Sequence, residues 1–249
     1  MISASKRASC KSVTAVIPYY GYSRQDKRSS SRITICAADV AKMLESVGVD
    51  RVISLDLHSG QIQGFFGPKI PVDNLSARTV GIRYIISNKI IENLSNCTVV
   101  TPDAGGVAIA RKFQLGLNNE CNNDCVQLAM MVKTRTKIGV SDMILVGDVN
   151  DRECLIVDDF IDTGSTLLSA ARLLKQRGAK RVVVFATHGI FSGDCHNKIE
   201  DSKDIDKVIV TNTVPLVKKS SKIIQISVGD FLAEVIRRVY EKEAVSSLQ

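Results

Sequence analysis

Short apolar segments alternate with amphipathic ones along most of the chain, which predicts strands and helices in turn. The predicted strands are residues 13–17, 51–56, 97–102, 126–132, 143–149, 154–158, 181–187, 208–211 and 223–228. Apolar side chains at three-to-four spacing predict helices at 37–47, 166–176 and 231–240, and another helix that follows 103–106 and ends at Leu117. This alternation favours an α/β fold with parallel sheets covered by helices.

The beginning of the chain is poorer in strands than the rest. Residues 1–12 have the character of the end of a helix, and about two predicted strands precede the second half, too few for an independent sheet. We therefore expect two domains, residues 1–74 and 75–249, of which the first is incomplete.

Composition limits the class of function. The chain has 249 residues, of which 45% are hydrophobic, and no apolar run approaches the roughly 18 residues of a membrane helix. The first residues are polar and basic, unlike a secretory signal, so we expect a soluble, cytoplasmic protein that binds no membrane. The net charge of +7 suits either nucleic acid or polyanionic small molecules. Because aromatics are only 5% and do not interleave with basic residues, we expect no nucleic-acid binding.

The cysteines predict neither disulfides nor a metal centre. The chain has seven, and the spacings around Cys121, Cys125 and Cys195 do not assemble a zinc set. Reduced thiols are expected in a cytosolic protein.

Residues 155–166, LIVDDFIDTGST, combine a strand, an acidic pair and a turn of small hydroxyl residues. Loop amides, hydroxyls and the positive end of the helix dipole form a site sized for one phosphate. Asp158 and Asp159 lie where open α/β sheets bind ligands, and they can accept hydrogen bonds from vicinal sugar hydroxyls. A capped helix after a strand is the structural alternative, but it accounts for one residue rather than for the whole series.

This segment resembles the phosphoribosyl-pyrophosphate loop of type I phosphoribosyltransferase folds. In that family the acidic pair binds the ribose hydroxyls and the loop binds the 5-phosphate. The resemblance implies two phosphoribosyltransferase-like domains. It also implies that ribose 5-phosphate is bound by Asp158, Asp159, Asp162, Thr163, Gly164, Ser165 and Thr166.

Residues 18–28 are similar to the ATP-binding loop of the ribose-phosphate pyrophosphokinases. That resemblance implies nucleotide contacts for Arg24, Gln25, Asp26 and Lys27. A guanidinium suits the role because it binds phosphate oxygens bidentately and stacks on a base. Taken alone, the segment would be interpreted as a solvated basic turn.

Residues 56–66, DLHSGQIQGFF, are close to the signature of the same family. The resemblance implies that His58 contacts ATP and takes part in catalysis, and that Asp56, His58 and Asp73 surround Mg²⁺. Residues 67–70 make the gap before Pro-Val-Asp longer than the family's usual one.

Residues 101–106, TPDAGG, resemble the family's Mg²⁺-linked turn, which implies a metal role for Asp103. Lys133 and Arg135 fall where the family has a mobile catalytic loop, and in an extended segment this spacing puts both cations on one side. Ile109 stands where the family usually carries Arg, so one phosphate contact is expected to be lost.

The resemblance to ribose-phosphate pyrophosphokinases covers nearly the whole chain. It implies transfer of the pyrophosphoryl group of ATP to the anomeric hydroxyl of ribose 5-phosphate, with Mg²⁺, in a homo-oligomer that is a hexamer or a dimer. The family has a further N-terminal portion, with a loop that holds adenine across a subunit interface, and we expect that portion to be absent here.

Three alternatives stay open at this level. A nucleobase phosphoribosyltransferase would share the Asp158 loop, although the segments around Arg24 and His58 argue against it. A non-catalytic regulatory paralogue would be favoured by loss of Lys133 and Arg135, and both are present. The third alternative is an inactive truncated chain, because a missing sheet segment exposes apolar surface and strand edges.

Overall fold

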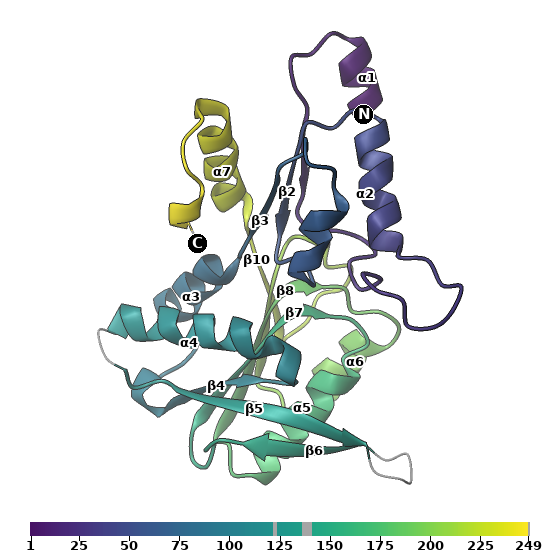
Figure 1. Cartoon of the computed structure of the whole chain (residues 1–249). Coiled ribbons are helices and arrows are strands. Elements are labelled where there is room, and N and C mark those ends of the chain that lie inside the picture. Colours follow the sequence, from purple (N-terminus) through teal and green to yellow (C-terminus); the bar gives the residue numbers. More distant parts are fainter. Residues whose placement is uncertain (122–123, 136–140, 249) are drawn as a thin grey trace. The chain divides into compact units, whose positions relative to one another are not determined.

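The chain folds into two compact units. The computed structural model describes residues 1–121, 124–135 and 141–248, and divides into Met1–Ala77 (unit 1) and Arg78–Gln249 (unit 2) (Figure 1). The domain boundary predicted from the sequence follows residue 74, whereas unit 1 ends at Ala77. Among the described residues, no helix is long and apolar enough to cross a membrane.

Unit 1 is built on a small parallel sheet with strand order β1-β2-β3. Its elements are α1 (Ile2–Arg7), β1 (Thr14–Ile17), α2 (Cys36–Ser46), β2 (Arg51–Leu55), the 3-10 helix η1 (Gly60–Phe65) and β3 (Val72–Leu75). Apolar residues of α2, β2 and η1 form its core, with Ala37, Ala41, Val52 and Ile62 fully buried.

The expectation of about two strands in the first domain was wrong, because β3 is a third strand of unit 1. Asp73 and Asn74 lie in the middle of β3 and interrupt its apolar pattern. Both polar side chains have partners: Arg51 pairs with Asp73, and the Asn74 side chain accepts a hydrogen bond from the backbone of Leu57. These contacts join residues that are far apart in sequence, so the local pattern does not reveal them.

Unit 2 is built on a larger sheet with strand order β10-β9-β8-β7-β4-β5-β6, parallel except for the pair β5 and β6. Its strands are β4 (Cys97–Thr101), β5 (Gln127–Arg135), β6 (Ser141–Val146), β7 (Glu153–Ile161), β8 (Arg181–Gly189), β9 (Lys207–Thr211) and β10 (Ile223–Ile226). Its helices are α3 (Arg78–Ser87), α4 (Val107–Cys121), α5 (Ser165–Gln176), α6 (Cys195–Asp201) and α7 (Gly229–Glu241), with 3-10 helices η2 (Leu94–Asn96), η3 (Ala104–Gly106) and η4 (Ser246–Leu248).

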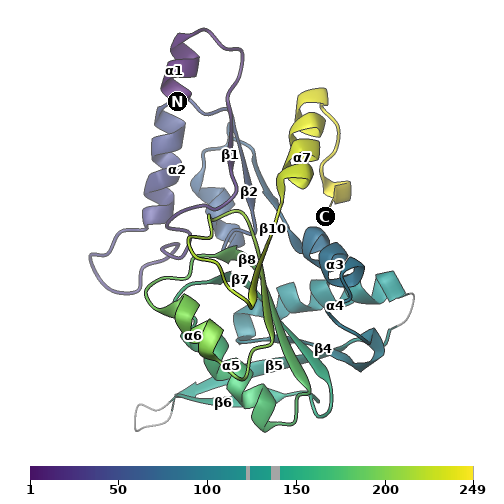
Figure 2. The same ribbon diagram turned by 180° about the vertical axis from the view of Figure 1, so that it is seen from behind.

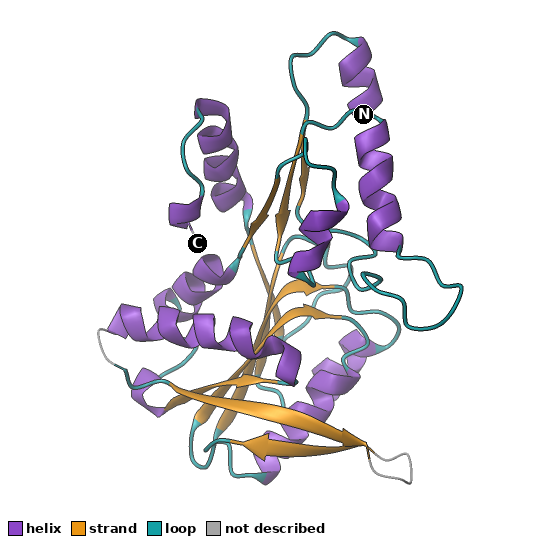
Figure 3. Cartoon of the chain, in the orientation of Figure 1, coloured by secondary structure: helices purple, strands orange, loops and turns teal. Residues whose placement is uncertain are grey.

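Helices cover both faces of the unit 2 sheet (Figures 2 and 3). On one face α5 and α6 bury Leu167, Ala170, Ala171, Leu174 and Ile199 against the strands. On the other, α3 and α4 bury residues that include Ile85, Phe113 and Leu117. This arrangement confirms the predicted α/β class, because central parallel strands need an apolar cover on each side.

Two strands are longer than predicted. β7 continues past the acidic pair to Ile161, because β8 stays paired with it as far as Gly189. β5 continues through Arg135, into the segment predicted to be a loop, because β6 pairs with it in antiparallel register. The helices α3 and α6 were not predicted: the apolar residues of α3 are spread around it, and α6 spans only Cys195–Asp201.

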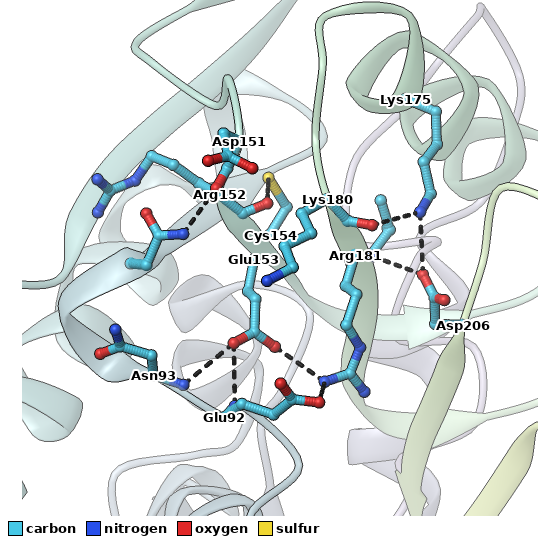
Figure 4. Close-up of polar contacts among 12 residues, drawn as sticks. Glu92, Asn93, Asp151, Arg152, Glu153, Cys154, Lys175, Lys180, Arg181 and Asp206 are labelled. Carbon is cyan, nitrogen blue, oxygen red and sulfur yellow. Dashed lines mark hydrogen bonds and ion pairs between the residues drawn. The ribbon is translucent and has the colours of Figure 1, made fainter.

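A polar network fastens the amino ends of the central strands of unit 2 (Figure 4). Buried Glu153, the first residue of β7, accepts hydrogen bonds from the backbone amides of Glu92 and Asn93 at 3.0 and 3.1 Å. Arg181, the first residue of β8, donates to Glu153 at 2.9 Å and to Glu92 at 3.2 Å. The parallel strands have their carboxyl ends at the opposite edge, so this network is structural and separate from the predicted ligand site.

Candidate active site

Most of the functional residues predicted for unit 2 lie near or after the carboxyl ends of parallel strands. The strands β8, β7, β4 and β5 are neighbours in the sheet and run in one direction, so their ends share an edge. The acidic pair lies near the end of β7, Asp103 follows β4, and His188 lies near the end of β8. An open α/β sheet binds ligands at this edge.

The loop between β7 and α5 turns sharply into the helix. Gly164 has a φ of +72° and immediately precedes Ser165, the first residue of α5. The hydroxyls of Thr163 and Ser165 lie 3.2 Å apart and both side chains are exposed. The first turn of a helix leaves backbone amides unpaired, so amides and two hydroxyls converge on one small region that suits a phosphate.

Cys195 packs against this turn at Gly164, and the sequence alone did not predict this contact. A Cβ added to Gly164 would lie 2.6 Å from the Cys195 sulfur, so the thiol fills the space that a side chain would need. Cys195 is buried, and burial raises the pKa of its thiol to about 11. The contact joins residues far apart in sequence, so no local signal could have revealed it.

The acidic pair lies within β7 and not after it. Asp158 accepts a hydrogen bond from the backbone amide of Asp159 at 2.9 Å, and Asp159 accepts one from Phe160 at 3.0 Å. Burial, together with the nearby carboxylates of Asp159 and Asp103, raises the pKa of Asp158 to about 8. This edge of the sheet therefore brings several carboxyl groups together. Hydrogen bonds from sugar hydroxyls, or a bound cation, would stabilise their charged forms.

Asp103 begins the turn that follows β4. Its Oδ1 accepts a hydrogen bond from the backbone amide of Gly106 at 3.1 Å, and the Thr101 hydroxyl donates to the Asp103 carbonyl at 2.8 Å. Asp103 is exposed, and its negative charge contributes to the raised pKa of Asp158. Sequence reasoning placed Asp103 and the acidic pair in separate motifs, and the structure brings them near one another.

Two predicted catalytic residues, Lys133 and Arg135, can be located only by their backbone. They lie in β5, opposite Met143 and Ser141 of β6. Their side chains lie outside the described part of the structure. Ile109 lies in the first turns of α4 and is partly exposed.

A hydroxyl and imidazole cluster lies at the ends of β8 and β9, and the sequence analysis assigned it no role. Thr213 is 2.8 Å from Nδ1 of buried His188, and its hydroxyl also contacts the Thr187 carbonyl at 3.2 Å. Thr211 donates to the same carbonyl at 2.6 Å. The signal was present, because both segments follow predicted strands, but the pairing of β8 with β9 is needed to join them.

In unit 1 the segment predicted to bind ATP forms the loop after β1. It is fastened to the start of α2: the Tyr20 hydroxyl donates to the Ala37 carbonyl at 3.0 Å, and the Ala37 amide donates to the Gln25 carbonyl at 3.2 Å. Arg24, Gln25 and Lys27 are exposed. The buried Oδ1 of Asp26 has no hydrogen-bond partner within the described residues.

The predicted metal ligands of unit 1 come from the segment after β2 and from β3. Asp56 and exposed His58 follow the end of β2, and Asp56 Oδ2 accepts a hydrogen bond from the Ala77 amide at 2.9 Å. Asp73 lies within β3 and pairs at 2.5 Å with Arg51, the first residue of β2. In the described ranges, no three His, Cys, Asp or Glu side chains gather in a way that could hold a metal ion.

A cavity of about 870 Å³ lies elsewhere in unit 2. It is lined by α3, β10, α7 and η4, with Tyr84, Arg83 and Phe231 among its walls. None of the predicted ribose 5-phosphate residues lines it, and its position at the outer strand β10 separates it from the loop after β7. We therefore assign the candidate site to the polar residues at the ends of β4, β7 and β8, and not to this cavity.

Comparison with known proteins identifies the family. Residues 1–48 match the family model described as the N-terminal domain of ribose phosphate pyrophosphokinase, and residues 118–249 match the phosphoribosyl synthetase-associated domain. The chain is similar to the ribose-phosphate pyrophosphokinases of Wolinella succinogenes, at 47% identity over all of this chain and 76% of the relative, and of Helicobacter pylori, at 43% identity over all of this chain and 74% of the relative.

A solved structure agrees with these sequence relatives. The crystal structure of phosphoribosylpyrophosphate synthetase from Mycobacterium smegmatis is 39% identical, with a TM-score of 0.85 over 97% of this chain and 76% of that chain. Similarity of this extent in both sequence and fold leaves one assignment: the chain belongs to the ribose-phosphate pyrophosphokinase family.

Proposed function

We propose that this chain transfers the pyrophosphoryl group of ATP to the anomeric hydroxyl of ribose 5-phosphate, giving phosphoribosyl pyrophosphate and AMP. Its family membership supports the reaction, and the names of its relatives state the same activity. The observation that carries the proposal onto particular residues is the loop between β7 and α5, which joins an acidic pair to a phosphate-sized turn.

The loop binds ribose 5-phosphate through two kinds of contact. The 5-phosphate is bound by backbone amides and hydroxyls of residues 162–166, where the positive end of α5 adds to the attraction. Asp158 and Asp159 accept hydrogen bonds from the ribose hydroxyls. This orientation leaves the anomeric hydroxyl free to attack, and catalysis of phosphoryl-type transfer depends mainly on such alignment.

The nucleotide side of the reaction rests on unit 1. Arg24, Gln25, Asp26 and Lys27 contact ATP, and the exposure of Arg24, Gln25 and Lys27 on the loop after β1 supports this role. His58 contacts the phosphates. Lys133 and Arg135 stabilise the charge that develops on the transferred group, as cations do in phosphoryl-transfer enzymes.

Mg²⁺ fits some of the predicted ligands better than others. Asp103 fits, because its exposed carboxylate lies in an acidic region and Mg²⁺ prefers oxygen ligands. In unit 1, Asp56 and His58 follow β2 and are the ligands that the family resemblance implies. Asp73 does not fit, because Arg51 already neutralises its carboxylate. When bound with ATP, Mg²⁺ would neutralise phosphate charge while keeping several waters.

We also propose that the chain assembles as a homo-oligomer, as the family resemblance implies.

Ser165 and Ser169 provide a matched test of the phosphate loop. Both are exposed serines of α5, but only Ser165 lies in the first turn. A hydrogen bond to a charged group contributes about 1.5–3 kcal/mol, so Ser165→Ala is expected to raise the KM for ribose 5-phosphate roughly 10-fold or more. Ser169→Ala is expected to leave it unchanged. The assay follows AMP formation from ATP as ribose 5-phosphate is varied.

Two results would overturn the proposal. Equal KM values for ribose 5-phosphate in both variants would show that the Ser165 hydroxyl does not bind the 5-phosphate. Release of pyrophosphate from phosphoribosyl pyrophosphate that depends on a nucleobase, without AMP formation from ATP, would identify a nucleobase phosphoribosyltransferase instead.

A further inference from the structure

Two thiols lie close together at the junction of α4 and β5. Cys121 is the last residue of α4, Cys125 precedes β5, and their sulfur atoms are 3.6 Å apart. Both side chains are partly exposed. A disulfide bond is about 2 Å long, so the two sulfurs must move closer together before they can bond. Neither thiol belongs to the candidate active site.

Side-chain hydrogen bonds fix the backbone beside Cys125 to α4. The amide of Val126 donates to Asn118 Oδ1 at 3.0 Å, and the carbonyl of Val126 accepts from Gln114 Nε2 at 2.6 Å. Gln114 is itself held by Arg111 at 2.6 Å. These contacts hold the start of β5 against the helix that ends at Cys121, so the fold itself brings the two ends of this junction together.

We propose that Cys121 and Cys125 form a redox-active dithiol that is oxidised to an intramolecular disulfide by low-molecular-weight disulfides. One thiol loses its proton and attacks the small disulfide, forming a mixed disulfide and releasing one small thiol. The second protein thiol loses its proton and displaces the other small thiol, which closes the protein disulfide. Two protein thiols are oxidised, one small disulfide is reduced, and a reducing thiol pool reverses the reaction.

The remaining cysteines of unit 2 are poor competitors. Cys97, Cys154 and Cys195 are buried. Burial raises the pKa of the Cys97 thiol well above its usual range, that of Cys154 to about 12 and that of Cys195 to about 11. A thiol must ionise to attack a disulfide, so these three are expected to stay reduced.

The test uses oxidised glutathione and the folded wild-type chain. After treatment, free thiols are alkylated under denaturing conditions and the tryptic peptide that contains both cysteines is weighed. We expect this peptide to lack both alkyl groups and to have lost the mass of two hydrogen atoms. Treatment with a reducing thiol before alkylation should restore two alkylation sites.

Variants distinguish a dithiol from two independent thiols. Cys125→Ser should leave a persistent glutathione adduct on Cys121, because the resolving thiol is gone. Cys36→Ser, which removes a partly exposed cysteine of unit 1, should form the disulfide as the wild type does. The proposal is overturned if both wild-type thiols remain alkylated, if glutathione adducts persist in the wild type, or if either cysteine is linked elsewhere. The wild-type measurement decides the question even if a variant folds poorly.

Discussion

Gly164 has a φ of +72°, which disfavours any residue with a side chain. A Cβ at this position would also lie 2.6 Å from the Cys195 sulfur, which is too close. Gly193 offers a matched control, because its φ is +60° and an added Cβ would meet nothing within 4 Å. Both substitutions to Ala therefore carry a similar backbone cost of about 1 kcal/mol, but only Gly164→Ala also forces Cys195 to move.

We expect Gly164→Ala to weaken ribose 5-phosphate binding at least about 10-fold, because the phosphate loop is displaced. Gly193→Ala is expected to bind within about twofold of the wild type. Isothermal titration calorimetry measures both dissociation constants, and urea unfolding checks that both variants are folded. Equal affinities for the two variants would mean that the turn at Gly164 does not shape the phosphate site.

Asp158 gives the stability of the chain a predictable pH dependence. Its pKa is raised to about 8 by burial and by Asp159 and Asp103, whereas an unfolded Asp titrates near 4. Between these values the folded chain holds a proton that the unfolded chain has lost, so the free energy of unfolding falls as pH rises through the window.

Asp158→Asn cannot take up this proton but keeps an oxygen that accepts from the Asp159 amide. We expect its free energy of unfolding to vary less between about pH 5 and pH 8, and to exceed that of the wild type at about pH 8 by at least about 1 kcal/mol. Urea unfolding at several pH values measures both curves. Parallel curves for variant and wild type would show that Asp158 ionises normally.

At the scale of elements, the amino and carboxyl ends of the central strands perform different tasks. Glu153 and Arg181 fasten the starts of β7 and β8, while the ends of these strands carry the candidate site. Replacing Glu153 with Gln removes the charge that Arg181 faces in a buried position, which is expected to cost about 2–3 kcal/mol of unfolding free energy.

Asp204→Asn is the control for this prediction, because Asp204 pairs with Arg172 at 3.9 Å and the Arg172 side chain is 73% exposed. Its expected cost is below about 0.5 kcal/mol. Both values come from urea unfolding, and ribose 5-phosphate binding by folded Glu153→Gln should match the wild type. A small cost for Glu153→Gln would show that the network in Figure 4 contributes little to stability.

Local patterns predicted elements well where one face of a helix or one strand carried the signal. The inner face of α5, with Leu167, Ala170, Ala171 and Leu174, is buried as the spacing predicted. Elements with distant partners were missed or shortened: β3 pairs with β2, and the end of β7 pairs with β8. The phosphate loop had a local motif, but its support by Cys195 did not.

At the scale of the molecule, each unit carries most of its predicted ligand residues near or after the carboxyl ends of parallel strands. The nucleotide loop and His58 follow β1 and β2 in unit 1, and the ribose 5-phosphate loop follows β7 in unit 2. The sequence predicted these two sets from family motifs. It could not predict that Asp103 would lie close enough to raise the pKa of Asp158, because this proximity arises from sheet order.

In the proposed reaction, the anomeric oxygen of ribose 5-phosphate attacks the β-phosphorus of ATP. The most direct test uses ribose 5-phosphate labelled with ¹⁸O at the anomeric position, together with ATP and Mg²⁺, followed by phosphorus NMR. We predict AMP and a phosphoribosyl pyrophosphate whose sugar-linked phosphorus shows the isotope shift of a bridging ¹⁸O. Release of free pyrophosphate or phosphate from ATP, with the label left on unreacted ribose 5-phosphate, would show that the anomeric oxygen does not attack ATP on this chain.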